Sequence, residues 1–361
     1  MCERVQERQN FMAAFEGAYQ TVRKSIGWWH REDLGYLAIS GPDRFTWLQG
    51  MVSNDTRLLA NGQTERLPVC FLDATGHLLS DGVLITVAGT HPLAAAMGAK
   101  GQDLLLAELP KTTVSRILTH LDRLLIMEDV ELADVSAKVR AITLQGPDVA
   151  TYLQRAIWTS RMKSGATFWT AIEFACRTVQ VDHTGSGGLD LYWGIENRRT
   201  VEDALNSLAA WEIDPATVET LRVEAGIPLY GIDMDETVLA PEANLTGYVS
   251  LTKGCYVGQE IVARIDARGH TNRALTGLIL EGEEQPAPGS KLFFHSDAEP
   301  PRETGRLTSI VPVSPAAEGK TIALGYVRHE HREPGTRLVL GEEGQGAAVV
   351  TTLPFYTRPS A

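Results

Sequence analysis

Apolar residues recur in short runs between polar turns from residue 34 to residue 134, and this pattern predicts alternating strands and helices. GYLAIS is typical of a strand, and FTWLQGMVS places Phe45 and Leu48 on one face of a helix. LPVCFLDATGHLLSDGVLITV predicts two strands joined by a turn at residues 73–76, and LAAAMGAKGQDLLLAEL predicts a further helix. The segment is expected to form an α+β unit.

Residues 139–268 show the same mixture of patterns. RAITLQGP predicts a strand and a turn, PDVATYLQRAIW a helix, and TVQVDHTGSGGLDLYWG two strands around a glycine turn. In VEDALNSLAAWEI, Leu205, Leu208 and Trp211 fall at helical spacing and predict an amphipathic helix. A second α+β unit is therefore expected.

Beyond His270 the pattern changes to short alternating runs such as ALTGLILEG, KLFFHS, TIALGYVR and AAVVTTLPF, separated by Gly, Pro and charged residues. Such runs predict a small antiparallel β-barrel or sandwich. A chain of 361 residues also exceeds the size at which one hydrophobic core keeps growing. We expect an N-terminal helical segment, two α+β units and a C-terminal β domain, at residues 1–32, 33–134, 135–270 and 271–361.

Charge and composition narrow the function classes. The chain has 45 acidic and 33 basic residues, a formal net charge of −12 and no long block of Lys or Arg, so general nucleic-acid binding is not expected. No run approaches the roughly 20 apolar residues of a membrane helix, and the N-terminus lacks the apolar region of a signal peptide. The four cysteines include no CxxC pair and no His at ligand spacing, so we expect no disulfide framework, no metal site and a cytoplasmic location.

Three stretches of the sequence are candidate ligand sites. In DHTGSGGLDLYW, residues 182–193, the glycines either permit a close approach to a flat ligand or form an ordinary hairpin. In LRVEAGIPLYGIDMDE, carboxylates accompany Arg222, whose planar fork suits a carboxylate; a solvated acidic face is the alternative. Asp81, inside the apolar strand GHLLSDGVLI, either faces solvent by alternation or meets a partner.

A fourth candidate site is KGCYVGQEIVAR, residues 253–264, which contains a lone cysteine. Cysteine is often buried as plain packing, and Cys255 would then be inert. Lys253 lies two residues before it, and a helix that begins near Gly258 would lower the pKa of a nearby thiol. Cys255 is therefore either a core residue or a reactive thiol.

Several segments together resemble one known superfamily over nearly the whole chain. RVEAGIPLYGIDMDE resembles the glycine-cleavage T-protein, an aminomethyltransferase that binds tetrahydrofolate. LQGMVSNDT, HLDRLLIMEDVEL, TIALGYV and AAVVTTLPF also resemble that superfamily in order and position. KGCYVGQEIVAR is similar to the signature of the YgfZ-type folate-binding proteins, which are associated with iron–sulfur cluster assembly and repair, whereas T-proteins lack that cysteine.

The resemblance implies two ferredoxin-like α+β units that form a folate-binding ring, followed by a C-terminal antiparallel β-barrel. HTGSGGLD stands where T-proteins have a pattern like YTGEDGFE, so Asp190 would take the carboxylate role and His183 would replace the tyrosine. Arg222 falls at the family's folate-site arginine, and Tyr256 is expected to contact the folate.

Ser80 and Asp81 stand where T-proteins have two acids, and this departure separates two functions. Because Ser80 supplies no charge, it is expected to contribute to folate binding only, and binding can survive without turnover. The resemblance then implies a tetrahydrofolate-binding accessory protein that serves iron–sulfur client proteins, with Cys255, Lys253 and Asp81 as the candidate catalytic residues. The alternatives are a tetrahydrofolate-dependent aminomethyl- or methyltransferase, and an interaction module that does not bind folate.

Overall fold

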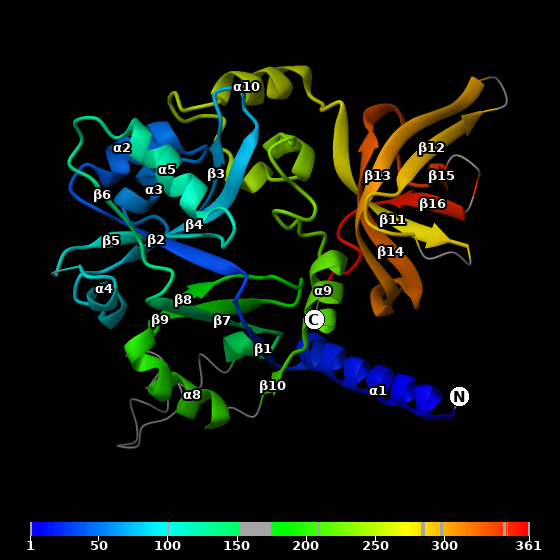
Figure 1. Ribbon diagram of the computed structural model, residues 1–361, viewed down its shortest axis with the longest axis horizontal. Helices are drawn as coiled ribbons and strands as arrows, with labels where there is room; N and C mark the ends of the chain where they lie inside the picture. The colour runs from blue at the N-terminus through cyan, green and yellow to red at the C-terminus, as the bar shows by residue number, and fades with distance from the viewer. Residues whose placement is uncertain are drawn as a thin grey trace. The chain divides into compact units, whose positions relative to one another are not determined.

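The computed structural model of the chain contains two compact units, each assembled from separate segments of the sequence. Figure 1 labels their helices and strands. Unit 1 comprises Met1–Leu48, Thr56–Pro68 and Gly82–Val218, and unit 2 comprises Gln49–Asp55, Val69–Asp81 and Glu219–Ala361. The structure describes residues 2–99, 101–151, 175–207, 210–282, 286–296, 299–341, 344 and 346–359.

The first sheet contains the strands expected from the alternation in residues 34–134. Its members are β2 (Leu34–Ser40), β3 (Arg66–Leu72), β4 (Leu78–Val87), β5 (Leu104–Pro110) and β6 (Glu131–Asp134). They lie in the order β3-β4-β5-β2-β6. The predicted hairpin is confirmed: β3 and β4 flank a turn in which the Asp73 N–H donates to His77 O at 3.0 Å.

The helix predicted over LAAAMGAKGQDLLLAEL is wrong in its second half. Helix α4 (Pro92–Ala96) stops early, and Gly98 follows with a φ of +91°, a conformation that suits the residue after a helix end. Strand β5 occupies the rest of the run and lies between β4 and β2, almost wholly buried. A continuous apolar run is typical of a buried helix and also of a strand covered on both faces, so strand pairing decided this element.

The second sheet confirms the strands expected around the glycine loop. Its members are β1 (Gly27–His30), β7 (Val139–Gln145), β8 (Arg177–Gln180), β9 (Gly188–Gly194) and β10 (Trp211–Glu212). They lie in the order β10-β1-β7-β9-β8, with β1 and β10 parallel and the other pairs antiparallel. Most of PDVATYLQRAIW, predicted as a helix, lies outside the described residues.

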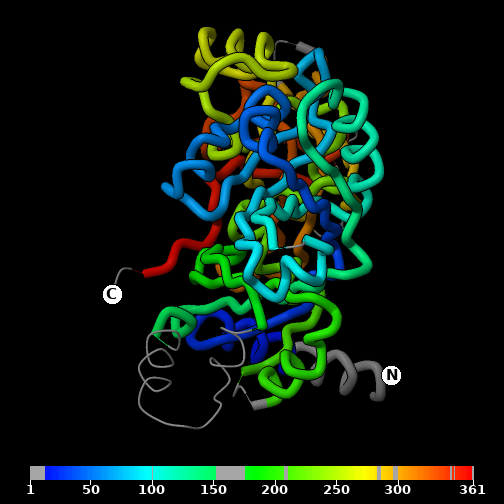
Figure 2. Tube along the Cα trace, turned by 90° about the vertical axis from the view of Figure 1, so that its left-hand side faces the viewer, coloured from blue at the N-terminus to red at the C-terminus, as the bar shows by residue number. Residues whose placement is uncertain are grey.

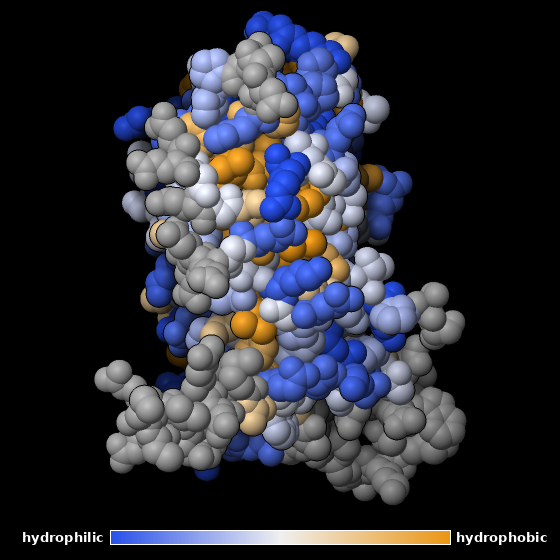
Figure 3. All heavy atoms as spheres, turned by 90° about the vertical axis from the view of Figure 1, so that its right-hand side faces the viewer, coloured by the Kyte–Doolittle hydropathy of each residue, from blue (hydrophilic) through white to orange (hydrophobic). Residues whose placement is uncertain are grey.

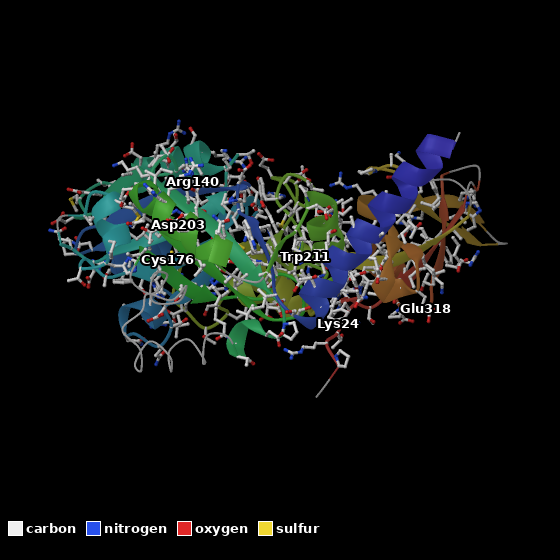
Figure 4. The ribbon with its side chains drawn as sticks, turned by 90° about the horizontal axis from the view of Figure 1, so that it is seen from below. Lys24, Arg140, Cys176, Asp203, Trp211 and Glu318 are labelled. Atoms are coloured by element: carbon white, nitrogen blue, oxygen red, sulfur yellow. The ribbon has the colours of Figure 1, made fainter. Side chains whose placement is uncertain are left out.

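Trp211 was expected on a helix and instead lies on β10, because α8 (Arg198–Ser207) ends before it. It remains 59% exposed. Helix α1 (Cys2–Lys24) passes alongside: a Cβ on Gly17 would lie 3.4 Å from the Trp211 ring, and Figure 4 labels this tryptophan and the last residue of α1. The indole therefore lies on a strand edge, partly covered by the N-terminal helix.

The remaining helices connect the strands. They are α2 (Arg44–Met51), α3 (Arg57–Ala60), α5 (Val114–Leu124), α9 (Pro215–Glu224) and α10 (Gln259–Arg268). Single 3-10 turns are η1 (Ile195–Asn197), η2 (Ala240–Ala243), η3 (Thr246–Tyr248), η4 (Pro315–Ala317) and η5 (His329–His331). The helix expected at FTWLQGMVS is confirmed as α2. Within the described part of the chain, none of the helices is long and apolar enough to cross a bilayer.

The C-terminal residues form a closed antiparallel barrel, as the short alternating runs predicted. Its strands are β11 (Arg273–Glu281), β12 (Lys291–Ser296), β13 (Glu299–Ser314), β14 (Lys320–Arg328), β15 (Arg337–Leu340) and β16 (Gly346–Thr351). They close in the order β11-β14-β13-β12-β15-β16, around a core that includes Leu278, Leu292 and Leu338. Figure 3 looks toward the barrel and shows apolar patches crossed by hydrophilic side chains. The α+β class with a C-terminal β-barrel is confirmed.

Candidate functional site

Asp190 lies at the centre of a buried polar cluster in unit 1. Strand β9 carries it between β7 and β8, opposite Thr143 and Val179, and the residue is 2% exposed. His183, in the glycine loop before β9, places Nε2 3.1 Å and 3.0 Å from the two carboxylate oxygens. Two residues of the motif HTGSGGLD are thus in direct contact, which the resemblance did not predict.

Arg31, in the link between β1 and β2, joins this cluster. Its Nη1 lies 3.0 Å from His183 Nε2 and 3.7 Å from Asp190 Oδ2, and the guanidinium also pairs with Asp33. Nε2 of a neutral imidazole either accepts a hydrogen bond from Arg31 or donates one to Asp190, depending on the tautomer. One imidazole nitrogen therefore lies between a cation and an anion that both compete for it.

A second carboxylate, Glu108 on β5, is buried in the same cluster. Tyr192 OH donates to Glu108 Oε2 at 2.6 Å and lies 3.3 Å from Asp190 Oδ2. Tyr36 packs edge-on against Tyr192 with ring centroids 6.3 Å apart, and its buried hydroxyl has no hydrogen-bond partner among the described residues. The cluster thus combines two acids with a hydroxyl whose bonding capacity is unused.

The pKa values of the two buried carboxylates are shifted in opposite directions. Burial alone would raise the pKa of Asp190, but the nearby His183 and Arg31 outweigh it, and the pKa falls to about 2. Burial raises the pKa of Glu108, and although Arg31 opposes this, the charge of Asp190 adds to it. Asp190 is therefore ionised at neutral pH, whereas Glu108 keeps its proton to a higher pH than an exposed glutamate.

Arg222 lies on α9 and is buried within unit 2. Its five N–H donors all have acceptors: Nη1 donates to Ile227 O at 2.6 Å and to Asp233 Oδ2 at 2.7 Å, Nη2 donates to Ser309 Oγ at 2.7 Å, and Nε and Nη2 donate to the Glu219 carboxylate. The guanidinium ties α9 to the following loop and to β13. A folate carboxylate could bind this arginine only by replacing one of these bonds.

Lys253, the first residue of the cysteine motif, is buried in unit 2. Its Nζ donates to Val52 O at 2.6 Å and to Asn54 O at 2.8 Å, and lies 4.9 Å from the centroid of the Tyr256 ring. Carbonyl oxygens and the aromatic face both stabilise a buried ammonium. The lysine therefore holds residues 52–54 against the motif.

Ser80 and Asp81 occupy different surroundings on β4. Ser80 is fully buried and its hydroxyl donates to Asp81 O at 2.7 Å, whereas Asp81 is partly exposed. Burial and the charge of Asp81 raise the pKa of the Cys70 thiol; burial and Cys70 in turn raise the pKa of Tyr256 to about 12. The Cys70 thiol is therefore linked electrostatically to Asp81 and to Tyr256 of the cysteine motif.

Cys255 is exposed, so the interpretation of this thiol as a core residue is wrong. Helix α10 begins four residues later, after Gly258, which has a φ of +80°. A Cβ at Gly258 would lie 2.5 Å from Asp73 O, so glycine lets the motif pass close to the β3–β4 turn. Figures 1 and 2 both show α10 beside that turn.

The predicted site residues fall into separate networks. Asp190 and His183 belong to the cluster in unit 1, whereas in unit 2 Asp81 and Tyr256 interact electrostatically with Cys70, Lys253 lies over the Tyr256 ring, and Arg222 has its own set of partners. Sequence reasoning missed four members of the unit 1 cluster: Arg31, Tyr36, Glu108 and Tyr192. Glu108 did carry a signal, because it is the one charge in the apolar run LLLAELP. Arg31 carried none, since His183 lies 152 residues away.

Comparison with known proteins places these features in a family. A family profile described as the GCVT N-terminal domain matches residues 3–253. The chain belongs to the GCVT family. An aminomethyltransferase of Rippkaea orientalis is 28% identical over 357 residues, covering 95% of this chain and 89% of that protein. One of Saccharopolyspora erythraea is 29% identical over 349 residues, covering 94% and 89%.

A solved structure of a GCVT-family protein supports the same fold. Glycine cleavage system aminomethyltransferase T from Bartonella henselae superposes with a TM-score of 0.76 at 19% identity, covering 95% of this chain and 90% of that one. The family profile confirms the expected membership of the T-protein superfamily. The relatives named here are aminomethyltransferases, and members of this family use tetrahydrofolate.

Proposed function

We propose that this protein is a tetrahydrofolate-dependent one-carbon transferase of the aminomethyltransferase type. The observation that carries the proposal is the ionised, buried Asp190 at the position that the resemblance assigns to a folate-binding carboxylate, with Glu108 beside it. The names of the relatives favour transfer over a purely accessory role. Tetrahydrofolate supplies the nitrogen atoms that carry the one-carbon unit.

The unit 1 cluster fits the polar edge of a pterin. An amino-pyrimidinone ring presents N–H groups, which donate hydrogen bonds to carboxylates. It also presents a carbonyl oxygen, which accepts a hydrogen bond from a hydroxyl. Asp190 and Glu108 are the acceptors we assign, and the Tyr36 hydroxyl, buried without a partner among the described residues, is the donor. Arg31 and His183 keep Asp190 ionised.

We assign proton transfer to Asp81, at the position where the resemblance places the paired acids of T-proteins. A folate nitrogen that receives a one-carbon unit must lose a proton, and a partly exposed carboxylate can hold it. Ser80 is fully buried and uncharged, so it takes no part in this step. Lys253 and Tyr256 would act by positioning, because the ammonium holds residues 52–54 through two carbonyl oxygens. The roles that the resemblance gives Arg222, Tyr256 and Ser80 as folate contacts remain predictions.

The proposal is tested by supplying the protein with tetrahydrofolate and a panel of aminomethyl and methylated amine donors. Mass spectrometry should detect a one-carbon folate, and Asp81→Asn should lose product while tetrahydrofolate still binds in calorimetry. Asp190→Asn should weaken binding itself. Tetrahydrofolate binding without product across the panel would refute the transferase and leave a folate-binding protein; no binding at all would refute both.

A second candidate function rests on the exposed thiol of Cys255 in a motif similar to that of the YgfZ-type proteins. In this role the protein binds tetrahydrofolate and serves iron–sulfur client proteins. Cys255→Ala should then abolish complementation of a cellular iron–sulfur defect while folate affinity stays unchanged. Full complementation by that variant would remove the thiol from the function.

A further inference from the structure

A polar cavity of about 680 Å³ lies within unit 2, beside the barrel. It is lined by β13 and β14, by the first residue of β11 and by the segments around His77 and Glu242. None of the residues assigned above to folate binding or to transfer lines it. The proposed reaction therefore does not account for this cavity.

Three buried donors in the wall of this cavity lack acceptors among the described residues. They are Thr304 Oγ1, Arg306 Nε and Tyr326 OH. Thr304 and Tyr326 are each 1% exposed. Thr304, at an irregularity in the pairing of β13 with β12, and Arg306 both line the cavity, and Arg306 lies directly opposite Tyr326 on β14. Buried donors in native proteins nearly always have acceptors, so three together indicate an absent acceptor.

The charges around the cavity identify the class of that acceptor. Glu242 is paired with Arg273 at 3.1 Å, and Glu303 is paired with Lys291 at 2.7 Å, so both lining carboxylates already have cationic partners. Arg306 lies 6.0 Å from the centroid of the Tyr326 ring. The positive charge of Arg306 acts electrostatically on Asp235, but no ion pair within 4 Å joins these two residues.

Arg328 is exposed and adds a further positive charge to the lining. Buried hydroxyl donors beside arginines are suited to an oxyanion, because each oxygen accepts several hydrogen bonds and guanidinium groups match its geometry. A neutral polar ligand would leave the excess positive charge uncompensated.

We propose that this cavity binds the oxyanion group of a small molecule, a carboxylate or a phosphate, through Thr304, Arg306 and Tyr326, with Arg328 adding positive charge. The site is independent of the proposed transfer reaction. Carboxylate and phosphate share the chemistry that these residues recognise, so the experiment separates the two.

The test titrates the full chain with citrate and with tripolyphosphate, each at matched ionic strength against chloride, by calorimetry. Saturable binding of either anion is expected, and the tighter one identifies the group. Arg306→Gln should weaken binding about tenfold or more, since a charge-assisted hydrogen bond is lost. Arg337→Gln is the matched control: this barrel arginine pairs with Glu281 outside the cavity and should leave affinity unchanged.

Tyr326→Phe separates binding from folding. Because the hydroxyl has no partner among the described residues, its removal should not lower the melting temperature without anion, yet it should weaken anion binding. Two results would overturn the proposal: absence of saturable binding for both anions, or equal affinities of the native chain, Arg306→Gln and Tyr326→Phe. Folate turnover is not a readout, so either result leaves the proposed function untouched.

Discussion

The hydroxyl of Tyr192 lies 2.6 Å from Glu108 Oε2 and 3.3 Å from Asp190 Oδ2, so one donor faces carboxylates that belong to two different sheets. A phenol has one proton and donates to one acid at a time, and the shorter distance favours Glu108. This contact joins β9 to β5 within unit 1. It also places an ionised acid beside one that tends to keep its proton.

Tyr192→Phe is expected to destabilise the protein by about 1–3 kcal/mol, because it removes the donor to a buried carboxylate. Urea denaturation measures the change in the free energy of unfolding. Tyr36→Phe is the matched control, since its hydroxyl has no partner among the described residues and its loss should be nearly neutral. Tyr36→Phe should nevertheless weaken tetrahydrofolate binding; an unchanged affinity would remove Tyr36 from the proposed site.

The pKa of Asp190 predicts acid sensitivity. It falls from the ordinary 3.8 to about 2 in the folded protein, so the ionised form is favoured by folding. This contribution, on the order of 2 kcal/mol, is fully present above pH 4 and is lost as the pH falls from about 4 to about 2. Asp190→Asn should therefore be less stable at pH 7 and should lose less stability on acidification. Parallel stability curves for the two proteins between pH 7 and pH 2 would contradict this.

Lys253→Met is expected to destabilise unit 2 by about 1–3 kcal/mol or more, because Val52 O and Asn54 O lose a charged donor. Lys320→Met is the control, since Lys320 is exposed on β14 and its replacement should change the free energy of unfolding little. Denaturant unfolding compares the two variants. Equal stability would show that the ammonium does not hold residues 52–54 in solution.

Thiol reactivity should separate the described cysteines. Cys255 is exposed, whereas burial raises the pKa of Cys176 to about 12 and also raises that of Cys70, so neither buried thiol forms a thiolate readily. In a Cys2→Ser background, a thiol-specific chromophore should label one cysteine of the native protein quickly. Cys255→Ala should remove that fast phase, and all remaining thiols should react only on unfolding. A fast phase that survives in Cys255→Ala would show that another site is open.

The periodicity of apolar residues predicts strands and helices correctly where only one face of the element is buried. The β3–β4 hairpin, α2, both strands around the glycine loop and the barrel strands follow from the residues themselves. The motif pattern also led to the superfamily, whereas the roles that it gives Asp190 and His183 remain predictions. LLLAELP could not be read in this way, because a strand buried on both faces loses the period of two that identifies it.

The sequence by itself determined the α+β class, the barrel and the family, because these depend on local periodicity and on motifs that are each continuous in the chain. Only the tertiary structure decided that Arg31 and Glu108 join Asp190, that Arg222 is fully engaged within unit 2, and that Lys253 is buried whereas Cys255 is exposed. The physical reason is that a hydrogen bond or a pKa depends on distances set by strand pairing. Residues far apart in the chain reach those distances only when the sheets form.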